Sequence, residues 1–321
     1  MGSQPKIFAI SDGRAGIERQ AQALAGAIAN QIGARVETKG LNPKAPQVFL
    51  PPLLWPNPIN ALPKEQRDIL NNLPDIWVGN GRRAIPYSII AKKRGAFVVQ
   101  IQDPKVPCNL FDAIIAPKHD NVKGENVFET LGGLVWYSEK QIKEELEKFP
   151  KYLYETREKI LVILGGNSKT HKFTQERAKQ IIENMRALQN PNRVFFITVS
   201  RRTPSEICQE FRNFAQENNH EFFENVQKDG PNPYLARLAR SDIALVTEDS
   251  ANMLSDCAFF GLPINLIKLQ GGSKKFDRLH NSFIDAGAAR WFDKNVQKFT
   301  YDKINSVDLI AKNIIALWQN K

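Results

Sequence analysis

Two polar segments in the second half of this sequence follow directly after apolar runs, the position where parallel sheets bind ligands. The first, Gly165-Gly166-Asn167-Ser168, comes after the run KILVIL. Its glycines allow close approach of the backbone, and unpaired N–H groups with a serine hydroxyl could hold a diphosphate without a Walker lysine. The second, Ser200-Arg201-Arg202, carries two arginines that suit bidentate contacts to phosphate. A helix cap formed by Thr203 and Pro204 is a compatible alternative for this segment.

A third segment is the most specific, because polar residues crowd the expected start of a helix after the apolar run IALVT. Glu248, Asp249 and Ser250 stand at that start, where a small side chain leaves room for phosphate and the helix dipole favours an anion. Asp256 follows about one and a half helical turns later and could reach ribose hydroxyls. A helix cap alone would need only one of these residues.

The first half of the chain offers one comparable loop, Ser11-Asp12-Gly13-Arg14-Ala15-Gly16, after the first apolar run. Gly13 and Gly16 would allow a tight turn into a helix, with Arg14 between them and free N–H groups facing a ligand. The spacing is not Gly-x-Gly-x-x-Gly, so a dinucleotide fingerprint is absent, and a plain strand-to-helix turn is an equal alternative. Further along, Lys275 and Arg278 either line a binding site or belong to a solvated amphipathic helix.

Candidates for acid–base catalysis also lie at the ends of apolar runs in the first half. Asp103 follows FVVQIQ, and the pair His119-Asp120 follows DAIIAP. Either could be the general base for an acceptor hydroxyl, and an aspartate that forms a turn explains each position equally well. The four histidines stand apart and no cysteine cluster accompanies them, so we expect no metal site. No Gly-x-Ser-x-Gly nucleophile elbow is present.

The composition limits the class of protein. Lysine and arginine outnumber aspartate and glutamate by 44 to 34, and the net charge of +10 favours anionic partners. Nucleic acid is the weakest of these, because no recognised motif is present and the basic residues are dispersed, as on an ordinary solvated surface. Three separated cysteines support no disulfide framework, and no window has the roughly 18 apolar residues of a membrane helix. We therefore expect a cytoplasmic protein.

One segment could contact a membrane surface. Residues 82–94 place five basic residues around an apolar centre that contains Ile85, Ile89 and Ile90. As a surface helix, this segment would give weak, salt-sensitive, peripheral contact with anionic lipid on the cytosolic face of a membrane. The alternative, which we favour for the apolar face, is a helix of an α/β domain with its isoleucines turned to the sheet.

These residues need a framework of strands and helices to bring them together. Short β-rich runs alternate with amphipathic stretches, which predicts parallel sheets built from βαβ units. We expect an α/β fold of two Rossmann-like, doubly wound domains that face each other across a cleft. The first covers residues 1–150, with a terminal helix in 303–321 packing back on it, and the second covers residues 158–302. The charged stretch Tyr137–Lys159 predicts a connection between them, and seven prolines within 43–63 predict an irregular excursion.

The individual elements follow from the same patterns. Strands are predicted for the runs KIFAIS, RVETKG, DIWVGN, AFVVQIQ and DAIIAP in the first half and KILVILGG, RVFFITVS, EFFENV, IALVTEDS and PINLIKL in the second. Helices are predicted near residues 16–32, 84–94, 174–188, 204–217, 233–239, 250–260, 276–286 and 307–319.

A serine-bearing helix that ends in Gly-Leu-Pro, a Gly-Gly loop and an asparagine shortly before Gly-Ala-Ala resemble the second domain of GT-B glycosyltransferases, notably the peptidoglycan N-acetylglucosaminyltransferase. The matching stretches are SDCAFFGLP, LGGNS and HNSFIDAGAAR, at Ser255–Pro263, Leu164–Ser168 and His280–Arg290. By this resemblance, diphosphate and ribose would be held by Gly165, Gly166, Ser168, Ser250 and Asp256. The transferase carries Gly-Gly-His in its N-terminal loop where this chain has Gly16-Ile17-Glu18, so the resemblance assigns no catalytic base.

Over the whole chain, the sequence is similar to the mitochondrial-fission-protein-like family of plants and bacteria. The similarity is carried, in order, by SDGRAGIERQAQALA, WPNP, GNGRRAIP, IQDP, APKHDNVKGENVFETLGGL, ILGGNSKTHKF, TVSRRTP, VTEDSANMLSDCAFFGLP and KFDRLHNSF. The resemblance implies a glycosyltransferase-like protein, and the plant member of the family is tied to mitochondrial division on the outer organelle surface.

Three functions compete on this basis. The leading hypothesis is a metal-independent glycosyltransferase that binds a nucleotide-diphosphate sugar in the cleft, uses no other cofactor, and transfers the sugar to a cell-envelope or lipid-linked acceptor. The second is a nucleotide-sugar epimerase, because some epimerases share the two-Rossmann architecture. The third is a non-catalytic membrane- or division-associated protein that has lost turnover. The nucleotide, the sugar, the acceptor and the oligomeric state stay open.

Overall fold

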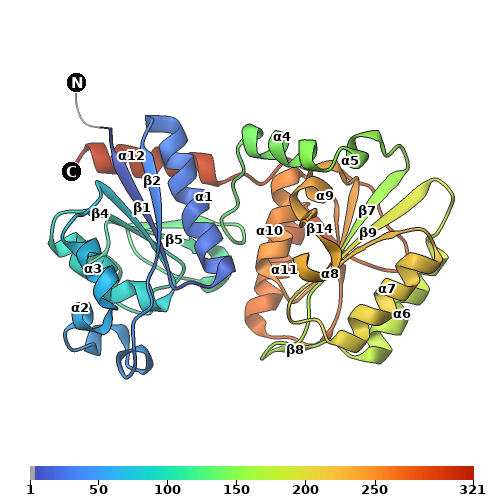
Figure 1. The fold of residues 1–321 in the computed structure, drawn as a ribbon, viewed down its shortest axis with the longest axis horizontal. Helices are drawn as coiled ribbons and strands as arrows, with labels where there is room; N and C mark the ends of the chain where they lie inside the picture. The colour runs from blue at the N-terminus through green and yellow to red at the C-terminus, as the bar shows by residue number, and fades with distance from the viewer. Residues whose placement is uncertain (1–3) are drawn as a thin grey trace. The chain divides into compact units, whose positions relative to one another are not determined.

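The computed structural model describes residues 4–321, which fold into two compact units. Unit 1 contains the chain up to Trp136 together with Asn305–Lys321, and unit 2 contains Tyr137–Ile304. Each unit has one six-stranded sheet with helices around it (Figure 1). The predicted α/β fold with two Rossmann-like domains is therefore confirmed.

The sheet of unit 1 is entirely parallel and has the order β2-β1-β3-β4-β5-β6. Its strands are β1 (Lys6–Ser11), β2 (Arg35–Gly40), β3 (Ile76–Asn80), β4 (Phe97–Ile101), β5 (Ala113–Pro117) and β6 (Val127–Thr130). Every residue of β3, β4 and β5 is buried, as apolar strands covered on both faces require. Because β1 lies between β2 and β3, the loops after β1 and β3 leave the sheet at its topological switch point, where such sheets bind ligands.

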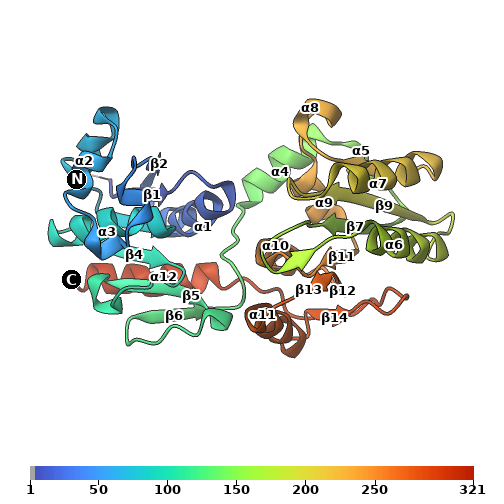
Figure 2. The same cartoon turned by 90° about the horizontal axis from the view of Figure 1, so that it is seen from below.

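Helices cover both faces of this sheet. On one face, α1 (Ala15–Ile32) and α12 (Val307–Gln319) lie side by side (Figures 1 and 2). They share one core, to which α1 contributes Leu24 and α12 contributes Ile314. The terminal segment of the chain thus completes the core of unit 1. On the other face, α3 (Ile85–Lys93) packs with the proline-rich segment in a second apolar cluster.

The proline-rich segment forms only short helical turns, as its composition predicts. They are η1 (Gln47–Phe49), η2 (Pro52–Leu54), α2 (Pro58–Ala61) and η3 (Lys64–Leu70). Buried Trp55 fixes the segment to α3 through an edge-to-face contact with Tyr87, at 6.2 Å between ring centroids. Three further 3-10 turns of unit 1 are η4 (Arg82–Ala84), η5 (Cys108–Leu110) and η6 (Lys118–Asp120).

The segment 82–94 contains η4 and α3, and its apolar face is turned to the sheet. Ile85 and Ile89 are buried in the core, and Ile90 is partly buried against it. The suggestion that these isoleucines meet lipid headgroups is therefore wrong, and the alternative favoured from the sequence holds. Among the described residues, no helix combines the length and the apolar character needed to cross a bilayer.

The main sheet of unit 2 is also entirely parallel, with the order β10-β9-β7-β11-β12-β14. Its strands are β7 (Glu158–Leu164), β9 (Arg193–Val199), β10 (Glu221–Phe223), β11 (Ile243–Thr247), β12 (Ile264–Ile267) and β14 (Ala289–Trp291). A short antiparallel ribbon pairs β8 (His171–Lys172) with β13 (Gln270–Gly271). The switch point of this sheet lies between β7 and β11.

The helices of unit 2 are α4 (Glu139–Lys148), α5 (Lys151–Tyr154), α6 (Gln175–Ala187), α7 (Ser205–Glu217), α8 (Val226–Asp229), α9 (Tyr234–Arg240), α10 (Ala251–Phe260) and α11 (Lys274–Asp285). Neighbouring α6 and α7 cover one face of the sheet (Figure 2) and bury an apolar cluster that includes Met185 and Phe211.

The stretch Tyr137–Lys159, expected to connect two domains, belongs instead to unit 2. It contains α4 and α5, and Tyr152 of α5 is almost fully buried against the ring of Phe196, at 5.0 Å between centroids. The Tyr152 hydroxyl donates to Glu221 Oε2 at 2.7 Å and accepts from Arg237 Nε at 3.0 Å. These buried contacts attach α5 to the core of unit 2.

Candidate functional site

The carboxyl edge of the unit 2 sheet brings three of the predicted segments together around one carboxylate. Asp249, whose side chain is fully buried, accepts hydrogen bonds from Gly166 N at 3.0 Å and from the Thr247 hydroxyl at 2.8 Å. Its third partner is Arg202, with 2.7 Å between Nη2 and Oδ2. These contacts tie the loops after β7, β9 and β11 to one another. We call Gly165, Gly166, Arg202, Thr247 and Asp249 the Asp249 junction.

The two glycines of this junction make room for the protein's own groups. A Cβ atom on Gly165 would overlap the Asp249 carboxylate, and one on Gly166 would overlap the backbone of Arg202. The glycines at 165 and 166 are therefore needed for the approach of neighbouring loops, independently of any ligand.

The backbone donors of the loop after β7 are already used. Gly165 N donates to the Thr247 hydroxyl at 2.7 Å, and Gly166 N donates to Asp249. Asn167 N donates to Arg202 O at 3.1 Å, and Ser168 N donates to His171 O at 2.9 Å. The expectation that this loop offers unpaired N–H groups is wrong, because neighbouring segments supply an acceptor for three of them and His171, three residues further along, supplies the fourth.

The side chains of the same loop serve its own geometry. Asn167 Oδ1 accepts from Phe173 N at 2.8 Å, and the Ser168 hydroxyl accepts from the backbone of Thr170 and His171. The loop after β9 is similar, since the Ser200 hydroxyl accepts from Arg202 N at 3.2 Å. Helix α7 begins one residue later than predicted, with Pro204 at its N-cap and no side-chain cap from Thr203.

Donors for an anion are found instead at the start of α10. Ser250 is the N-cap of this helix and its side chain makes no capping hydrogen bond. The N–H groups of a first helical turn have no intrahelical acceptor, and the helix dipole adds partial positive charge there. Arg201 and Arg202 are exposed in the neighbouring loop. The start of α10 with these arginines is the part of the predicted phosphate site that offers positive charge to a ligand.

Asp256 lies about one and a half turns further along α10, on its buried face. Its side chain is 1% exposed, and Oδ2 accepts from the Tyr234 hydroxyl of α9 at 3.0 Å. In this arrangement the carboxylate positions α9 against α10, a role the sequence alone did not indicate.

Glu248 and His280 form a second buried polar pair next to the Asp249 junction. Glu248 Oε1 accepts from Leu269 N at 2.7 Å, and the Glu248 carbonyl lies 2.8 Å from His280 Nε2. A carbonyl can only accept, so the His280 proton is on Nε2. Burial raises the pKa of Glu248 and lowers that of His280. The predicted cations Lys275 and Arg278, on the same helix as His280, are exposed.

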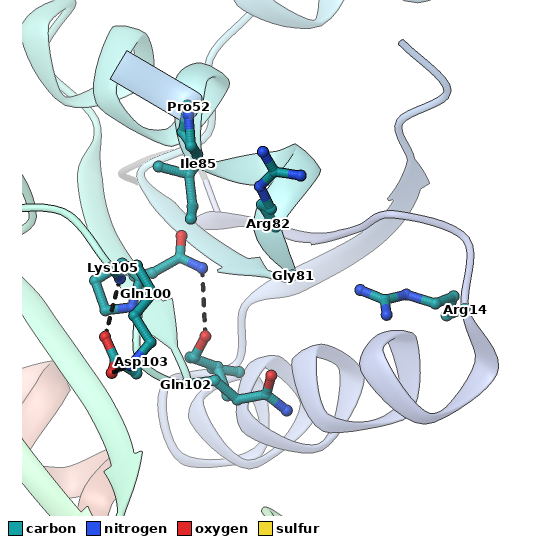
Figure 3. Close-up of a pocket in the computed structure, with 11 residues that line it drawn as sticks. Arg14, Pro52, Gly81, Arg82, Ile85, Gln100, Gln102, Asp103 and Lys105 are labelled. Carbon is teal, nitrogen blue, oxygen red and sulfur yellow. Dashed lines mark hydrogen bonds and ion pairs between the residues drawn. The ribbon is translucent and has the colours of Figure 1, made fainter. Parts of the chain in front are cut away.

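Unit 1 has its own cavity at the carboxyl edge of its sheet. A pocket of about 230 Å³ is lined by residues from the loops after β1, β3 and β4, with Pro52 of the proline-rich segment as a further wall (Figure 3). Two predicted site residues, Arg14 and Asp103, both line this pocket although 89 positions separate them in the chain. The Arg14 guanidinium is paired with Asp12 at 2.6 Å.

The remaining glycines of the first predicted loop have structural positions. Gly13 has a φ of 81°, which only glycine adopts freely, and its N–H donates to the Ser11 hydroxyl at 3.2 Å. Gly16 lies within the first turn of α1. This loop is therefore a turn between β1 and α1 that also carries Arg14 to the pocket.

The candidates for a general base have charged partners of their own. Asp103 engages Lys105 with both oxygens, at 2.9 Å to its backbone N and 2.5 Å to Nζ (Figure 3). This contact with Asp103, and to a lesser extent the charge of Asp120, raise the pKa of Lys105. His119 is buried beside Asp120, with 3.6 Å between Nε2 and Oδ1.

Sequence reasoning missed the other polar residues of this pocket. Gln100, Gln102 and Lys105 line it together with Asp103. Gln102 and Lys105 have φ values of 67° and 56°, an uncommon conformation outside glycine that clusters at functional sites. The Gln100 side chain donates to the Ile101 carbonyl at 3.3 Å, and its own carbonyl oxygen is buried without a partner. A Gln-Asp-Pro-Lys turn after a buried strand was the only signal in the sequence.

Known structures with a similar fold support this arrangement of strands. A UDP-GlcNAc 2-epimerase from Methanocaldococcus jannaschii is 13% identical, with a TM-score of 0.58 over 97% of this chain and 99% of that one. The glycotransferase of kitacinnamycin is 14% identical, with a TM-score of 0.52 over 99% and 95%. The UDP-GlcNAc 2-epimerase from Neisseria meningitidis, bound to UDP-GlcNAc, is 14% identical, with a TM-score of 0.52 over 98% and 99%. These likenesses show the GT-B type of fold.

Two relatives and one family match the sequence itself. The uncharacterized protein RP120 of Rickettsia prowazekii is 25% identical over 355 residues, which cover 98% of this chain and 99% of that protein. The mitochondrial fission protein ELM1 of Arabidopsis thaliana is 23% identical over 277 residues, which cover 75% of this chain and 63% of that protein. The family described as mitochondrial fission ELM1 matches residues 15–318. The chain therefore belongs to the mitochondrial fission ELM1 family.

Proposed function

We propose that the protein binds a nucleotide-diphosphate sugar at the carboxyl edge of the unit 2 sheet and transfers the sugar to an acceptor. The observation that carries this proposal is the uncapped start of α10 at the switch point, beside two exposed arginines. Helix N-termini and guanidinium groups are the usual partners of a diphosphate. The fold is shared with the Neisseria epimerase that binds UDP-GlcNAc, which supports a ligand of this class.

The transfer would proceed without a divalent metal. As the acceptor oxygen bonds to the anomeric carbon, the bond from that carbon to the diphosphate breaks, and the nucleoside diphosphate leaves with the electron pair. Arg201, Arg202 and the α10 dipole would neutralise its charge. For the base that takes the acceptor proton we propose the group of Asp103, His119 and Asp120 in unit 1. The three cysteines are free thiols, which supports a reducing, cytosolic location.

Isothermal titration with UDP and UDP-GlcNAc tests the binding step. Arg201→Ala should weaken UDP about 10–100-fold, because one charge-assisted hydrogen bond contributes about 1.5–3 kcal/mol. Arg186→Ala is the matched control, since Arg186 is an exposed arginine of the same unit on α6. If both variants and the unchanged protein bind UDP with equal affinity, the diphosphate does not bind at this edge of the sheet.

The epimerase alternative rests on the fact that two of the similar structures described above are epimerases. Product analysis separates the possibilities, because a transferase releases free nucleoside diphosphate whereas an epimerase returns a stereoisomer with the nucleotide still attached. If the protein binds UDP-GlcNAc but forms neither product with any acceptor in a panel, the third hypothesis, a non-catalytic division-associated protein, is favoured.

A further inference from the structure

Three large apolar side chains project from the proline-rich segment of unit 1. Phe49 is 78% exposed, Leu54 is 66% exposed and Leu53 is 53% exposed. They come from η1 and η2, two adjacent turns within six residues of sequence. Clusters of exposed apolar side chains on one loop mark interaction surfaces, whereas single ones are ordinary. We call Phe49, Leu53 and Leu54 the apolar tip.

The loop that carries the apolar tip is anchored, so the exposure is a property of the fold. Trp55 is buried and its indole N–H donates to Leu50 O at 3.0 Å. Arg82 donates to the carbonyls of Val48 and Leu50, at 3.3 and 2.7 Å. Two points on the core of unit 1 therefore hold this loop from behind while the three apolar side chains face outward.

The chain segment that carries the apolar tip has basic but no acidic residues. Between Glu37 and Glu65 lie three lysines, of which Lys39 is paired with Glu37 while Lys44 and Lys64 are exposed. Arg82 donates its hydrogen bonds to backbone carbonyls, which do not neutralise its positive charge. The adjacent Arg83 is exposed. A partner that suits this surface presents an apolar layer beneath a layer of negative charge.

We propose that the apolar tip docks on an anionic lipid bilayer, with Phe49, Leu53 and Leu54 at the acyl boundary and the exposed Arg82 and Arg83 at the phosphates. Aromatic and leucine side chains flanked by basic residues bind such interfaces through buried apolar area and attraction to anionic lipid. The apolar tip is a different candidate for membrane contact from the isoleucines of α3, of which Ile85 and Ile89 are buried. It is independent of nucleotide-sugar binding in unit 2.

Co-sedimentation of the whole protein with vesicles tests the proposal. We expect binding to phosphatidylcholine mixed with phosphatidylglycerol, little binding to phosphatidylcholine alone, and weakening at high salt. The combined variant Phe49→Ser, Leu53→Ser, Leu54→Ser should lose at least about tenfold in binding. The combined variant Leu309→Ser, Leu317→Ser is the control, because it removes exposed leucines of the same unit from α12. Hydrogen exchange with vesicles should show protection confined to residues 47–55.

Several results would overturn this proposal. Vesicle binding that persists in the triple serine variant, or equal binding to neutral and anionic vesicles, would do so. So would no binding of the unchanged protein to either kind of vesicle. If the tip instead joins two copies of the chain, light scattering without lipid will show a dimer that the triple variant abolishes. All variants change exposed side chains, so their thermal transitions should match that of the unchanged protein and a failure to fold is recognisable.

Discussion

Replacing Gly165 by alanine should destabilise unit 2 far more than a glycine-to-alanine change normally does. Gly165 has no left-handed φ, so its backbone accepts alanine without strain. The new Cβ, however, would overlap the carboxylate of Asp249, which must then move. Moving it breaks its bonds to Gly166 N, the Thr247 hydroxyl and Arg202.

The expected cost follows from what those bonds hold. Separating a buried carboxylate from its partners costs about 3–5 kcal/mol, since the charge is left without compensation. For a unit of this size, a loss of about 4 kcal/mol lowers the melting temperature by roughly 8–16 °C. Differential scanning calorimetry measures the effect and separates the transitions of the two units when they unfold independently.

Two controls isolate the collision from other effects of alanine. Gly40→Ala places its Cβ in open space and should change stability by less than about 1 kcal/mol. Gly230→Ala also meets nothing within 4 Å but has a φ of 80°, so its cost of about 1–2 kcal/mol measures backbone strain alone.

A double-mutant cycle provides the decisive measurement. If Asp249 is what the new methyl group displaces, the double variant Gly165→Ala, Asp249→Ala should be about as stable as Asp249→Ala alone. Additive losses from the two changes would refute the reasoning. A Gly165→Ala variant as stable as Gly40→Ala would refute it as well.

Three further outcomes are expected. Ile314→Ala should destabilise unit 1 by about 2–5 kcal/mol in calorimetry by leaving a cavity between α1 and α12, whereas Leu309→Ala on the exposed side of α12 should stay within about 0.5 kcal/mol. Burial, followed by the charge of Arg157, lowers the pKa of His220 from 6.5 to about 4, so only the unfolded chain takes up a proton between these values. Stability in denaturant should therefore fall as pH drops from 6.5 towards 4, and His220→Gln should flatten this slope; an unchanged slope would show that His220 is not its source. Any sugar transfer should continue in EDTA, and loss of turnover restored by manganese or magnesium would contradict the metal-independent mechanism.

The fold could be predicted from the sequence because both sheets consist mainly of buried apolar strands. The runs that form β3, β4 and β5 do not alternate between apolar and polar residues, which is the pattern of strands in parallel sheets covered by helices on both faces. The short edge strands β6 and β14 escaped prediction, since three or four residues carry too little periodicity. The helix α4 looked like a linker because none of its residues is buried.

The site was predictable in position but only partly in chemistry. Parallel strands end at a common edge, so the loops after β7, β9 and β11 had to meet there. A linear pattern does not tell that Asp249 and the backbone of Arg202 fill the space beside Gly165 and Gly166. Likewise, an aspartate such as Asp256 is expected at the surface from its residue type. It is buried because its side of α10 packs against α9, and the sequence does not show this packing.

The packing of α12 on α1 has a consequence for the protein as it emerges from the ribosome. Residues up to Trp136 appear first, but the part of α1 that packs against α12 stays uncovered until α12 has been made. All of unit 2 is synthesised in between, which takes roughly ten to thirty seconds at about 5–20 residues per second. Unit 2 thus has its full set of residues first, and the unit begun first is completed last. During that interval the bare face of α1 is a surface for chaperones to cover.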